Sequence, residues 1–476
     1  MNISDFLFLR HELSLMAVFV ILFIYDVAVG ERGKRYFHAV ACTLLGLHTA
    51  LGFVPAEAGA AFGGMYVTTD ISALMKNILS LGAFVVFLQA EGWLRTAARG
   101  KQGEFYVVLL STLLGMYFMA SAGSFMLLYL GIETASLPMA CLAAFDKGKD
   151  KSAEAGAKYI LLAALSSGIM LFGMSLLYGA TGSMYFADMG RAIAGLQGAS
   201  LLVLGFVFFF VGLAFKISIV PFHLWAADVY EGAPTSVTAY LSVVSKGAAV
   251  FALVFALWQV FGAMSAVWHH LLWGLSVLTI VLGNLFAIGQ KDIKRFFAFS
   301  SISQAGFILL GVMGGTAEGM AATTFFVLVY LFSNLAAFGV ISAVENASGR
   351  TDIAAYNGLY RSNPKLAFVM MLAVFSLAGI PPFAGFFSKF FIFAAAAEQG
   401  EYLLVFIALV NTVVSLFYYL LMVKAMFINP AEEGAVAGIR SGGYSRLSLA
   451  LCTAGILLAG LLSGIYEYIG ASSFGM

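Results

Sequence analysis

The sequence predicts an all-α protein that crosses a lipid bilayer many times. Of its 476 residues, 62% are hydrophobic and 10% are charged, whereas a soluble domain carries roughly 25% charged residues. Its apolar stretches reach about 20 residues, the length that a spanning helix needs, and the alternating segments of a barrel are missing. Only helices and closed barrels satisfy their own backbone hydrogen bonds in lipid. A bundle of spanning helices is therefore expected.

Fourteen apolar segments follow one another along the chain. Asp5 and Glu12 precede the first segment and no small-residue cleavage site follows it, so we expect an anchored helix rather than a removable signal peptide. The predicted segments are 13–29, 38–54, 71–88, 105–121, 125–145, 157–178, 201–225, 236–261, 267–288, 296–313, 320–344, 366–397, 402–428 and 447–469. Nothing beyond the last segment is expected to form a further element.

Two of the divisions between segments are inferred from length. A single helix over 105–145 would be about 60 Å long, twice the hydrocarbon thickness, so it is divided near Gly123. Gly314, Gly315 and Gly319 divide the tenth and eleventh segments in the same way.

Positive charges gather on alternate loops, which tests this segment count. Loops after odd-numbered segments hold 17 of the 25 Lys and Arg residues, and only Arg10 and Arg191 lie in loops on the opposite side. The 17 are Arg32, Lys34, Arg35, Arg95, Arg99, Lys101, Lys147, Lys149, Lys151, Lys291, Lys294, Arg295, Arg350, Arg361, Lys365, Arg440 and Arg446. By the positive-inside rule the odd loops are cytoplasmic, so both termini are expected on the outer face. The loop after segment seven departs from the trend, with Asp228 and Glu231 and no cation.

Composition also excludes several kinds of partner and cofactor. A net charge of +1 leaves no basic surface for a phosphate backbone, which excludes nucleic-acid binding. Cys42, Cys141 and Cys452 lie far apart without a CxxC pair, and the six histidines lack the spacing of paired haem ligands. No metal site and no cofactor are therefore expected in this chain.

Four charged residues stand in the middle of apolar segments: Glu133, Lys216, Lys246 and Lys389. A charge at the centre of a spanning helix costs about 2.5–3.5 kcal/mol on insertion scales. Four unpaired charges would together cost roughly 10–14 kcal/mol, as much as the whole stability of a typical domain. These side chains are therefore expected to be paired, hydrated or both.

Two of the segments that carry these charges are predicted to be broken helices. Pro221 follows Lys216 inside segment seven, and Pro381 and Pro382 precede Lys389 inside segment twelve. Interrupted helices in corresponding positions of two halves indicate a transport site.

The segments contain other polar groups, whose positions suggest different roles. Lys76 and Lys424 lie near segment ends and are expected to extend to the lipid headgroups, while Lys158 is intermediate. His223 either bonds carbonyls freed by Pro221 or relays protons.

Four motifs closely resemble those of the antiporter-like subunits of respiratory complex I. They are LGIETASLP, AFKISIVPFHLWAADVYEGAPTSVTAYLSVVSK, KDIKRFFAFSSISQAGF and GIPPFAGFFSKFF, in that order along the chain. The resemblance runs from about segment three to segment thirteen. It implies two inverted five-helix repeats, segments 4 to 8 and 9 to 13, with helices 7 and 12 broken. The single membrane domain, 1–476, would comprise three helices (13–88), the repeats (105–261 and 267–428) and a last helix (447–469).

The resemblance also implies roles for individual residues. Glu133 matches the segment-five glutamate of the family, Lys216 its lysine partner on segment seven, Lys246 the central lysine and Lys389 the segment-twelve lysine. Lys158 stands near a further lysine of segment six. Subunit M usually has a glutamate at the segment-twelve site, and subunit L continues into a long lateral helix. Lysine at this site and a short C-terminus therefore favour a third type of antiporter-like subunit, which is neither M nor L.

Proton transfer is the chemistry predicted for the row of four central charges, Glu133, Lys216, Lys246 and Lys389. Burial disfavours the charged form of a lysine and a nearby carboxylate favours it, so a Glu–Lys pair that opens and closes can release and hold a proton. We expect Glu133 to control Lys216, which passes its proton through water toward Lys246 and Lys389. Ser242, Ser245, Ser303, Gln304 and Tyr330 either orient that water or serve only as bonds between helices.

Energy for this transport would come from partner subunits. The resemblance implies other membrane-arm subunits as partners, among them a sister antiporter-like subunit and small membrane subunits, in the inner membrane of a bacterium. It places NADH, FMN, the iron–sulfur clusters and the quinone in partner subunits. The alternatives are an Mrp-like sodium/proton antiporter, subunit M, or a structural spacer whose buried charges fix helix register.

Overall fold

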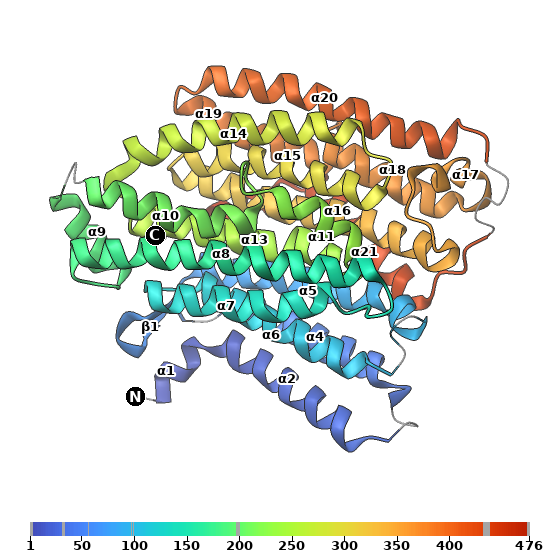
Figure 1. Ribbon diagram of the computed structural model, residues 1–476, viewed down its shortest axis with the longest axis horizontal. Helices are drawn as coiled ribbons and strands as arrows, with labels where there is room; N and C mark the ends of the chain where they lie inside the picture. The colour runs from blue at the N-terminus through green and yellow to red at the C-terminus, as the bar shows by residue number, and fades with distance from the viewer. Residues whose placement is uncertain are drawn as a thin grey trace.

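The chain folds into a bundle of helices that lie side by side, most of them along the long direction of the molecule (Figure 1). The computed structural model describes residues 3–30, 34–55, 57–96, 98, 100–196, 200–431 and 438–473. Twelve of the described helices are long and apolar enough to cross a membrane, and α4 (Phe37–Gly52) and α18 (Pro364–Ala378) are shorter apolar helices. The chain is an all-α polytopic membrane protein, as the sequence predicted.

Before the region of the four motifs come three apolar helices and a small hairpin. The elements are α1 (Ile3–Phe8), α2 (Arg10–Ala28), α4, β1 (Gly59–Ala61), the 3-10 turn η1 (Phe62–Gly64), β2 (Tyr66–Thr68) and α5 (Asp70–Thr96). The two strands pair antiparallel, with Gly59 opposite Thr68. The hairpin was not predicted, because three-residue strands carry too little alternation to be read from a sequence.

The remaining helices form two successive groups. The first comprises α6 (Gln102–Ala120), α7 (Phe125–Ala143), α8 (Asp150–Thr181), α9 (Phe186–Gly195), α10 (Ser200–Ile217), α11 (Leu224–Gly232), α12 (Thr235–Tyr240), the π-helical turn η2 (Leu241–Ser245) and α13 (Lys246–Gln259). The second comprises η3 (Gly262–Met264), α14 (Ser265–Ile288), α15 (Ile293–Met313), α16 (Ala317–Ser348), η4 (Ile353–Tyr356), α17 (Leu359–Ser362), α18, α19 (Ala384–Glu398), α20 (Tyr402–Phe427), α21 (Gly443–Leu461) and α22 (Ser463–Ser473).

Each of the fourteen predicted segments overlaps helical structure, and both inferred divisions are present. Helix α7 begins after Gly123, where Ser124 caps it by accepting a hydrogen bond from the Leu127 amide. A side chain at Gly123 would collide with the Gly64 carbonyl oxygen, 2.2 Å from the position of its Cβ. Helices α15 and α16 separate at Gly314 and Gly315, and Thr316 caps α16.

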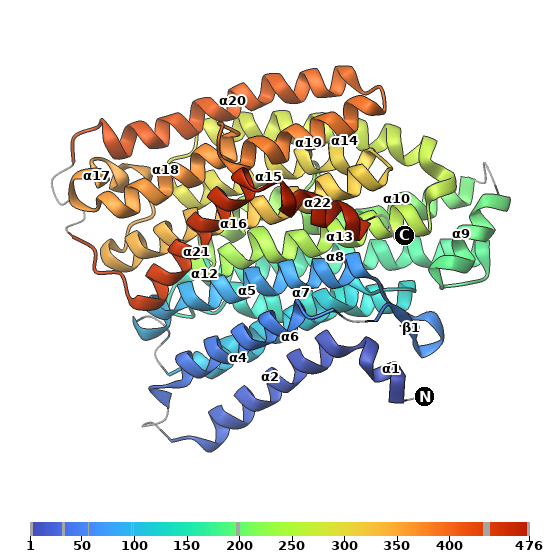
Figure 2. The ribbon, with the colours of Figure 1, turned by 180° about the vertical axis from the view of Figure 1, so that it is seen from behind.

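The predicted last segment, 447–469, was wrong as a single helix. Extended backbone at Leu462 separates α21 from α22, and α22 packs on α16 and α5 at the rear of the molecule (Figure 2). The turn brings Ile469 against the bundle, where it is 1% exposed. Burial of the Ile469 side chain favours the bend, and the bend cannot be recognised from hydropathy alone.

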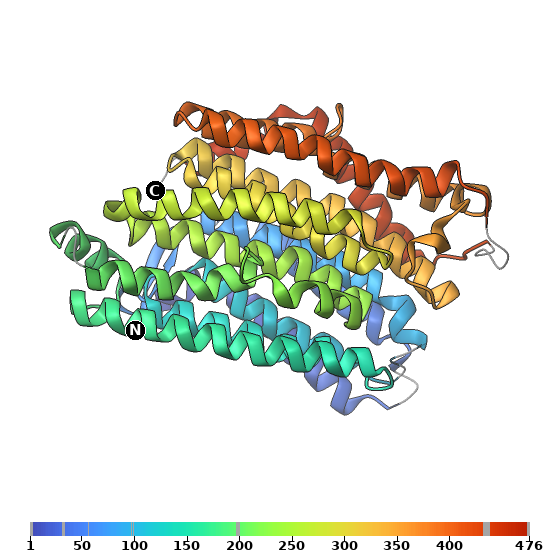
Figure 3. The same cartoon turned by 45° about the horizontal axis from the view of Figure 1, so that its top comes forward.

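Central and peripheral helices differ sharply in burial. Helix α15 is buried along its whole apolar window, and the run α12 to α13 over 94% of its window. Helices α2, α20 and α21 are buried over only 28%, and α20, orange-red, follows one outer edge (Figure 3). The centre of the bundle is therefore built from α15 and the run α12 to α13, which carries Lys246.

Both helices predicted to be broken are interrupted in the structure. Between α10 and α11 the chain leaves the helix at Ser218, whose φ is +64°, and passes through Pro221. Between α18 and α19 it turns at Gly379, φ +86°, a conformation that favours glycine, and continues through Pro381 and Pro382. Each interruption leaves carbonyl groups at a helix end inside the protein.

We expect Gly385→Ala to destabilise the second interruption. A Cβ at Gly385 would lie 1.6 Å from the Ser376 carbonyl oxygen, so α19 could not approach α18 as it does. Overpacking of this kind costs about 1–3 kcal/mol or more, which a lower thermal midpoint of the purified protein would report. The matched control is Gly168→Ala on α8, where a Cβ meets nothing within 4 Å. Equal thermal midpoints for the two variants would contradict the close approach.

Candidate functional site

The four predicted site residues lie on four different helices. Glu133 is on α7, Lys216 ends α10, Lys246 begins α13 and Lys389 is on α19. The three lysines are 6%, 1% and 4% exposed, and Glu133 is half-buried. The three lysine side chains are therefore enclosed by the protein rather than exposed to lipid.

Glu133 and Lys216 do not form an ion pair in this structure. Glu133 Oε1 is buried without a hydrogen-bond partner, and no described carboxylate lies within 4.0 Å of Lys216 Nζ. Glu133 nevertheless interacts electrostatically with Lys216. Lys216 also stands in the last turn of α10, whose free carbonyl end favours a positive charge. The two groups are near enough to influence each other and far enough apart to change distance.

Lys246 follows the π-helical turn η2, which sequence analysis did not predict. Its Nζ donates to the Ser301 carbonyl at 3.0 Å and also to the Ser301 hydroxyl. Tyr230 is hydrogen-bonded to the same hydroxyl at 3.3 Å. Single π-helical turns are frequent at functional sites, because they change the direction in which the following side chains point. Ser301 is thus hydrogen-bonded to both Lys246 and Tyr230.

Helix α16 adds a second set of polar groups beside Ser301. Asn334 Nδ2 donates to the Ser242 hydroxyl at 2.8 Å and to the Tyr330 hydroxyl at 3.1 Å. Tyr330 in turn interacts with Ser301. Of the polar residues singled out in the sequence, Ser242 and Tyr330 lie in this cluster. Ser301 and Asn334 were missed, because serine and asparagine in apolar helices are common packing residues.

Lys389 is held by the end of α18. Its Nζ donates to the Ala378 carbonyl at 3.2 Å, one residue before the turn at Gly379. The same nitrogen lies 4.7 Å from the centroid of the Phe307 ring, a cation–π distance. The broken helix therefore supplies the acceptor that an unbroken helix would have kept within its own ladder.

A small cavity lies between Lys389 and the polar cluster of α16. Its volume is about 10 Å³, close to the space that one water molecule needs. It is lined by Gln304, Phe326, Val329, Tyr330, Ser333, Ser376, Leu377, Gly385, Ser388 and Lys389. Lys246, Ser301, Tyr330, this cavity and Lys389 therefore form one connected polar series through the centre of the bundle.

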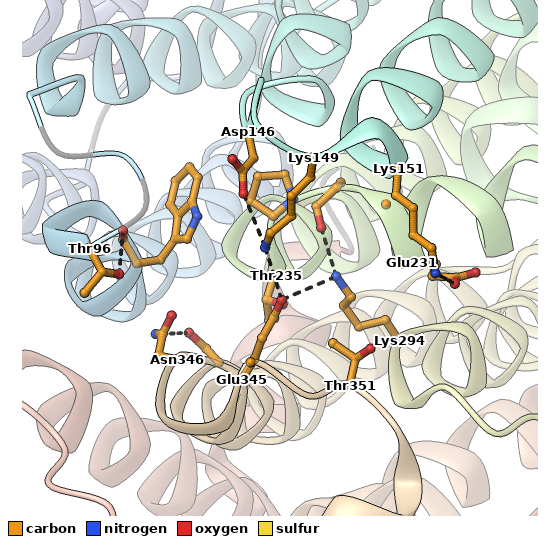
Figure 4. Close-up of a pocket in the computed structure, with 16 residues that line it drawn as sticks. Thr96, Asp146, Lys149, Lys151, Glu231, Thr235, Lys294, Glu345, Asn346 and Thr351 are labelled. Carbon is orange, nitrogen blue, oxygen red and sulfur yellow. Dashed lines mark hydrogen bonds and ion pairs between the residues drawn. The ribbon is translucent and has the colours of Figure 1, made fainter.

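A larger pocket opens at the end of the bundle that carries the odd-numbered loops (Figure 4). It has a volume of about 390 Å³ and is lined by Lys149, Glu345 and Lys294 among others. Glu345 lies 4.0 Å from Lys149 Nζ and 3.9 Å from Lys294 Nζ, and it accepts a hydrogen bond from Thr235. The described residues that line this pocket come from α5, α8, α11, α12, α15, α16 and the connections between them, and not from the four helices that carry Glu133, Lys216, Lys246 and Lys389.

The placement of Lys294 corrects the sequence analysis, which counted it with the loop cations. It lies in the first turn of α15, is 4% exposed, and donates to the Ala233 carbonyl at 3.1 Å. Ser301 follows it by seven residues, two helical turns, so both face the same side of α15. The floor of the pocket and the partner of Lys246 are therefore about 10 Å apart along one helix face. Arg32 and Arg99, two other predicted loop cations, lie outside the described residues.

Asp228 and Glu231, the acidic pair after segment seven, are neutralised by cations from elsewhere. Asp228 pairs with Lys158 at 2.6 Å and Arg295 at 2.7 Å. Glu231 pairs with Arg295 at 2.8 Å and Lys151 at 2.6 Å. The structure places both acids on α11 rather than in a loop, and α8 and α15 supply the cations that their own segment lacks. Lys158, whose side chain is 40% exposed, is thus part of a partly exposed ion network.

His223 lies inside the first helix break, at the start of α11. Its Nδ1 is buried without a hydrogen-bond partner among the described residues, and so is the hydroxyl of Ser218 in the same break. Two buried polar atoms without protein partners indicate a place where water enters the structure. A role of His223 in proton relay stays a prediction.

Lys76 corrects a second expectation. Predicted to reach the headgroups, it is fully buried and pairs with Glu12 at 2.6 Å. Tyr66 closes the group, since it donates to Glu12 at 2.8 Å and accepts from Lys76 at 2.8 Å. The pair joins α2, β2 and α5. Opposite charges near the ends of segments one and three were the only sequence signal for it. Lys424, by contrast, is exposed.

Comparison with known proteins gives consistent relatives. A family profile described as NADH:quinone oxidoreductase/Mrp antiporter, TM, matches residues 122–415. NADH-quinone oxidoreductase subunit N of Azobacteroides pseudotrichonymphae is 60% identical, covering 100% of this chain and 99% of the relative. The protein of the same name from Phocaeicola vulgatus is 54% identical over 98% and 99% of the two chains.

Solved structures with the same fold come from membrane complexes. A chain of respiratory complex I from Thermus thermophilus is 32% identical, with a TM-score of 0.80 over 96% of this chain and 98% of that one. A chain of the Mrp complex from a Dietzia species has a TM-score of 0.87 over 99% and 97% of the two chains, at 22% identity. The second likeness concerns the fold alone. No group of three metal-ligating side chains is present among the described residues.

We expect Lys76→Met to destabilise the packing of α2 on α5. The substitution leaves the Glu12 carboxylate buried without its partner, and breaking a buried pair costs about 3–5 kcal/mol. The thermal midpoint of the purified protein should fall, and the double variant Glu12→Gln, Lys76→Met should recover part of the loss. Lys424→Met, at an exposed position, is the control. A Lys76→Met protein as stable as this control would show that the pair does not hold these helices.

Proposed function

The chain belongs to the family of NADH-quinone oxidoreductase subunit N, among the antiporter-like membrane subunits of complex I and Mrp complexes, and we propose that it moves protons along Glu133, Lys216, Lys246 and Lys389. It is a multi-pass membrane protein and a subunit of a proton-translocating oxidoreductase. The proposal concerns which groups in this chain carry the protons.

The observation that carries the proposal is the connected polar series at the centre of the bundle. Lys246 donates to Ser301, Asn334 bridges Ser242, one turn before Lys246, to Tyr330, and Tyr330 and Lys389 line one water-sized cavity. A proton can pass between such groups by exchange of hydrogen bonds, provided that a lysine is able to give its proton up. Neither Lys246 nor Lys389 faces a carboxylate within ion-pair distance in the described residues, so neither is fixed in its charged form.

Glu133 and Lys216 provide the control at the other end of the row. In this structure they are apart, and Glu133 Oε1 has no hydrogen-bond partner. Approach of the two would favour a proton on Lys216, and separation would favour its release. The Ser218 hydroxyl and His223 Nδ1, buried in the first helix break without protein partners, are the groups that would hold water for transfer from Lys216 toward Lys246.

The pocket at the odd-loop end is the proposed cytoplasmic mouth. Glu345 is the proton acceptor there, and buried Lys294 holds it in place while the same face of α15 leads to Ser301. The four-way ion network of Asp228 and Glu231 closes the neighbouring rim. Lys158 belongs to this rim rather than to the central row.

The fold supports a fourteen-crossing topology with two inverted five-helix repeats. Predicted segments 4 to 8 correspond to α6 through α13, and segments 9 to 13 to α14 through α20, each group with one broken helix. Both breaks have a buried lysine beside them: Lys216 precedes the first, in the last turn of α10, and Lys389 follows the second, on α19. With the odd loops cytoplasmic, both termini lie on the outer face of a bacterial inner membrane.

Partner subunits supply the energy under this proposal. The relatives are named as subunits of NADH-quinone oxidoreductase, so NADH oxidation, through FMN and iron–sulfur clusters, and quinone reduction take place in other chains. A sister antiporter-like subunit and small membrane subunits would flank this one in the membrane arm. The row of buried lysines couples to that chemistry through conformational change rather than through a redox group of its own.

We expect Lys216→Ala to reduce proton pumping in the assembled complex by roughly a hundredfold, the smaller end of what loss of an acid–base group costs. Pumping is measured as the pH change in vesicles per quinone reduced. Lys424→Ala, on the exposed surface of α20, should leave that ratio unchanged. Normal pumping at normal turnover would contradict the role of Lys216. A complex that fails to assemble with Lys216→Ala, yet assembles and pumps with Lys216→Met, would assign the residue to helix register alone.

We expect Glu345→Gln to slow pumping without loss of assembly, because the amide keeps the hydrogen bond to Thr235 but cannot accept a proton. The slowing should ease as external pH on the cytoplasmic side falls, since protons then become less limiting. Glu318→Gln, at the opposite end of the same helix and exposed, is the matched control. Identical rates for the two variants at every pH would rule out this pocket as the mouth.

A further inference from the structure

A second hollow of the molecule differs in character from the proton path. It is a groove of about 1160 Å³ between the start of α18 and the first half of α21, lined by charged and apolar side chains. The two helices contact each other at the end of the bundle that carries the odd-numbered loops (Figure 2). The groove touches none of the residues of the lysine row.

Three cations stand at the mouth of the groove: Lys365, Arg440 and Arg446. All three are exposed, and no described carboxylate lies within 4.0 Å of any of them. Two other cations of the same end are paired, Arg295 with Asp228 and Arg350 with Asp352. The groove therefore concentrates positive charge that the described residues do not neutralise.

Backbone geometry fixes this mouth in place. The Ile439 amide donates to Asn363 Oδ1 at 2.6 Å, which ties the segment that carries Arg440 to the start of α18. Helices α18 and α21 both begin here, and neither is capped by a side chain. Their first-turn amides add partial positive charge to that of the three cations. Glu91, whose carboxylate lies beside Gly442, is already paired with Arg95 at 2.8 Å.

Beyond the cations the wall of the groove becomes apolar. Leu366 and Val369 from α18 face Leu449, Ala454 and Leu457 from α21. Leu457 lies eleven residues past Arg446, roughly 16 Å along the helix. That length is about half the ~30 Å hydrocarbon thickness, the depth of one leaflet. Charge at the headgroup level and an apolar channel one leaflet deep match an amphiphile in both chemistry and size.

We propose that this groove binds an anionic phospholipid, with its phosphate held by Lys365, Arg440 and Arg446 and an acyl chain along Leu449 and Leu457. Arginine is suited to the phosphate because its guanidinium donates two parallel hydrogen bonds to paired oxygens. Basic pockets between spanning helices on the cytoplasmic side are a known form of lipid site. A zwitterionic lipid would add an ammonium beside three cations and is disfavoured.

The test uses the intact membrane complex in nanodiscs of phosphatidylcholine with added phosphatidylglycerol, an anionic lipid with two acyl chains. A density map should show a branched, two-tailed feature in the groove, with its headgroup in contact with Arg446. The triple variant Lys365→Gln, Arg440→Gln, Arg446→Gln should lose this feature and retain at least one anionic lipid fewer per complex in native mass spectrometry. The control is Lys101→Gln, Lys147→Gln, Arg361→Gln, three exposed cations of the same end that do not line the groove.

Three results would overturn the proposal. The first is density of a neighbouring protein chain seated in the groove. The second is equal retention of anionic lipid by the triple variant and its control. The third is lipid density that persists unchanged in nanodiscs of phosphatidylcholine alone, because a site selected by charge would then be empty.

Discussion

A lysine inside a membrane protein must find an acceptor for its hydrogen bonds, and this chain supplies two kinds. Lys246 and Lys389 donate to main-chain carbonyls of Ser301 and Ala378. Lys76 instead meets the carboxylate of Glu12 and the hydroxyl of Tyr66. A carbonyl satisfies the ammonium without adding a counter-charge, whereas a carboxylate fixes the charged form. The first arrangement leaves proton release accessible, and the second locks helices together.

The breaks in the helices follow from this requirement. A regular helix keeps its carbonyls in its own ladder and has none to offer to a neighbour, apart from those of its last turn. By ending α10 and α18 inside the bundle, the chain frees carbonyls of the last turn of each helix, where Lys216 stands at the end of α10 and Lys389 bonds the end of α18. The π-helical turn before Lys246 is a smaller disturbance of the same kind. Each lysine of the central row is thus accompanied by an irregularity in a helix.

The outer parts of the structure use charge differently. At the odd-loop end some cations pair with acids from distant segments, as Arg295 does with Asp228 and Glu231. The polar pocket around Glu345 and the proposed lipid groove of Lys365, Arg440 and Arg446 lie at this same end. The two sites differ in their acidic residues. Glu345 neutralises cations in the pocket, whereas the described residues that line the groove include no acidic side chain. One surface therefore offers a mouth for protons and a separate seat for an anionic lipid.

The sequence by itself determined the spanning segments, the two broken helices and the central charges, because these depend on hydropathy, proline, glycine and the cost of a charge in lipid. It placed Glu133, Lys216, Lys246 and Lys389, and singled out Tyr330 and Gln304, which line the cavity of Lys389. Tertiary structure alone decided the partners. Ser301, Asn334 and Glu345 have ordinary local sequences, and Lys76 and Lys294 read as surface cations until α2 and the α11–α12 connection are packed against them. The reason is physical: transfer into lipid is a property of one segment, whereas a hydrogen bond between helices depends on which segments meet.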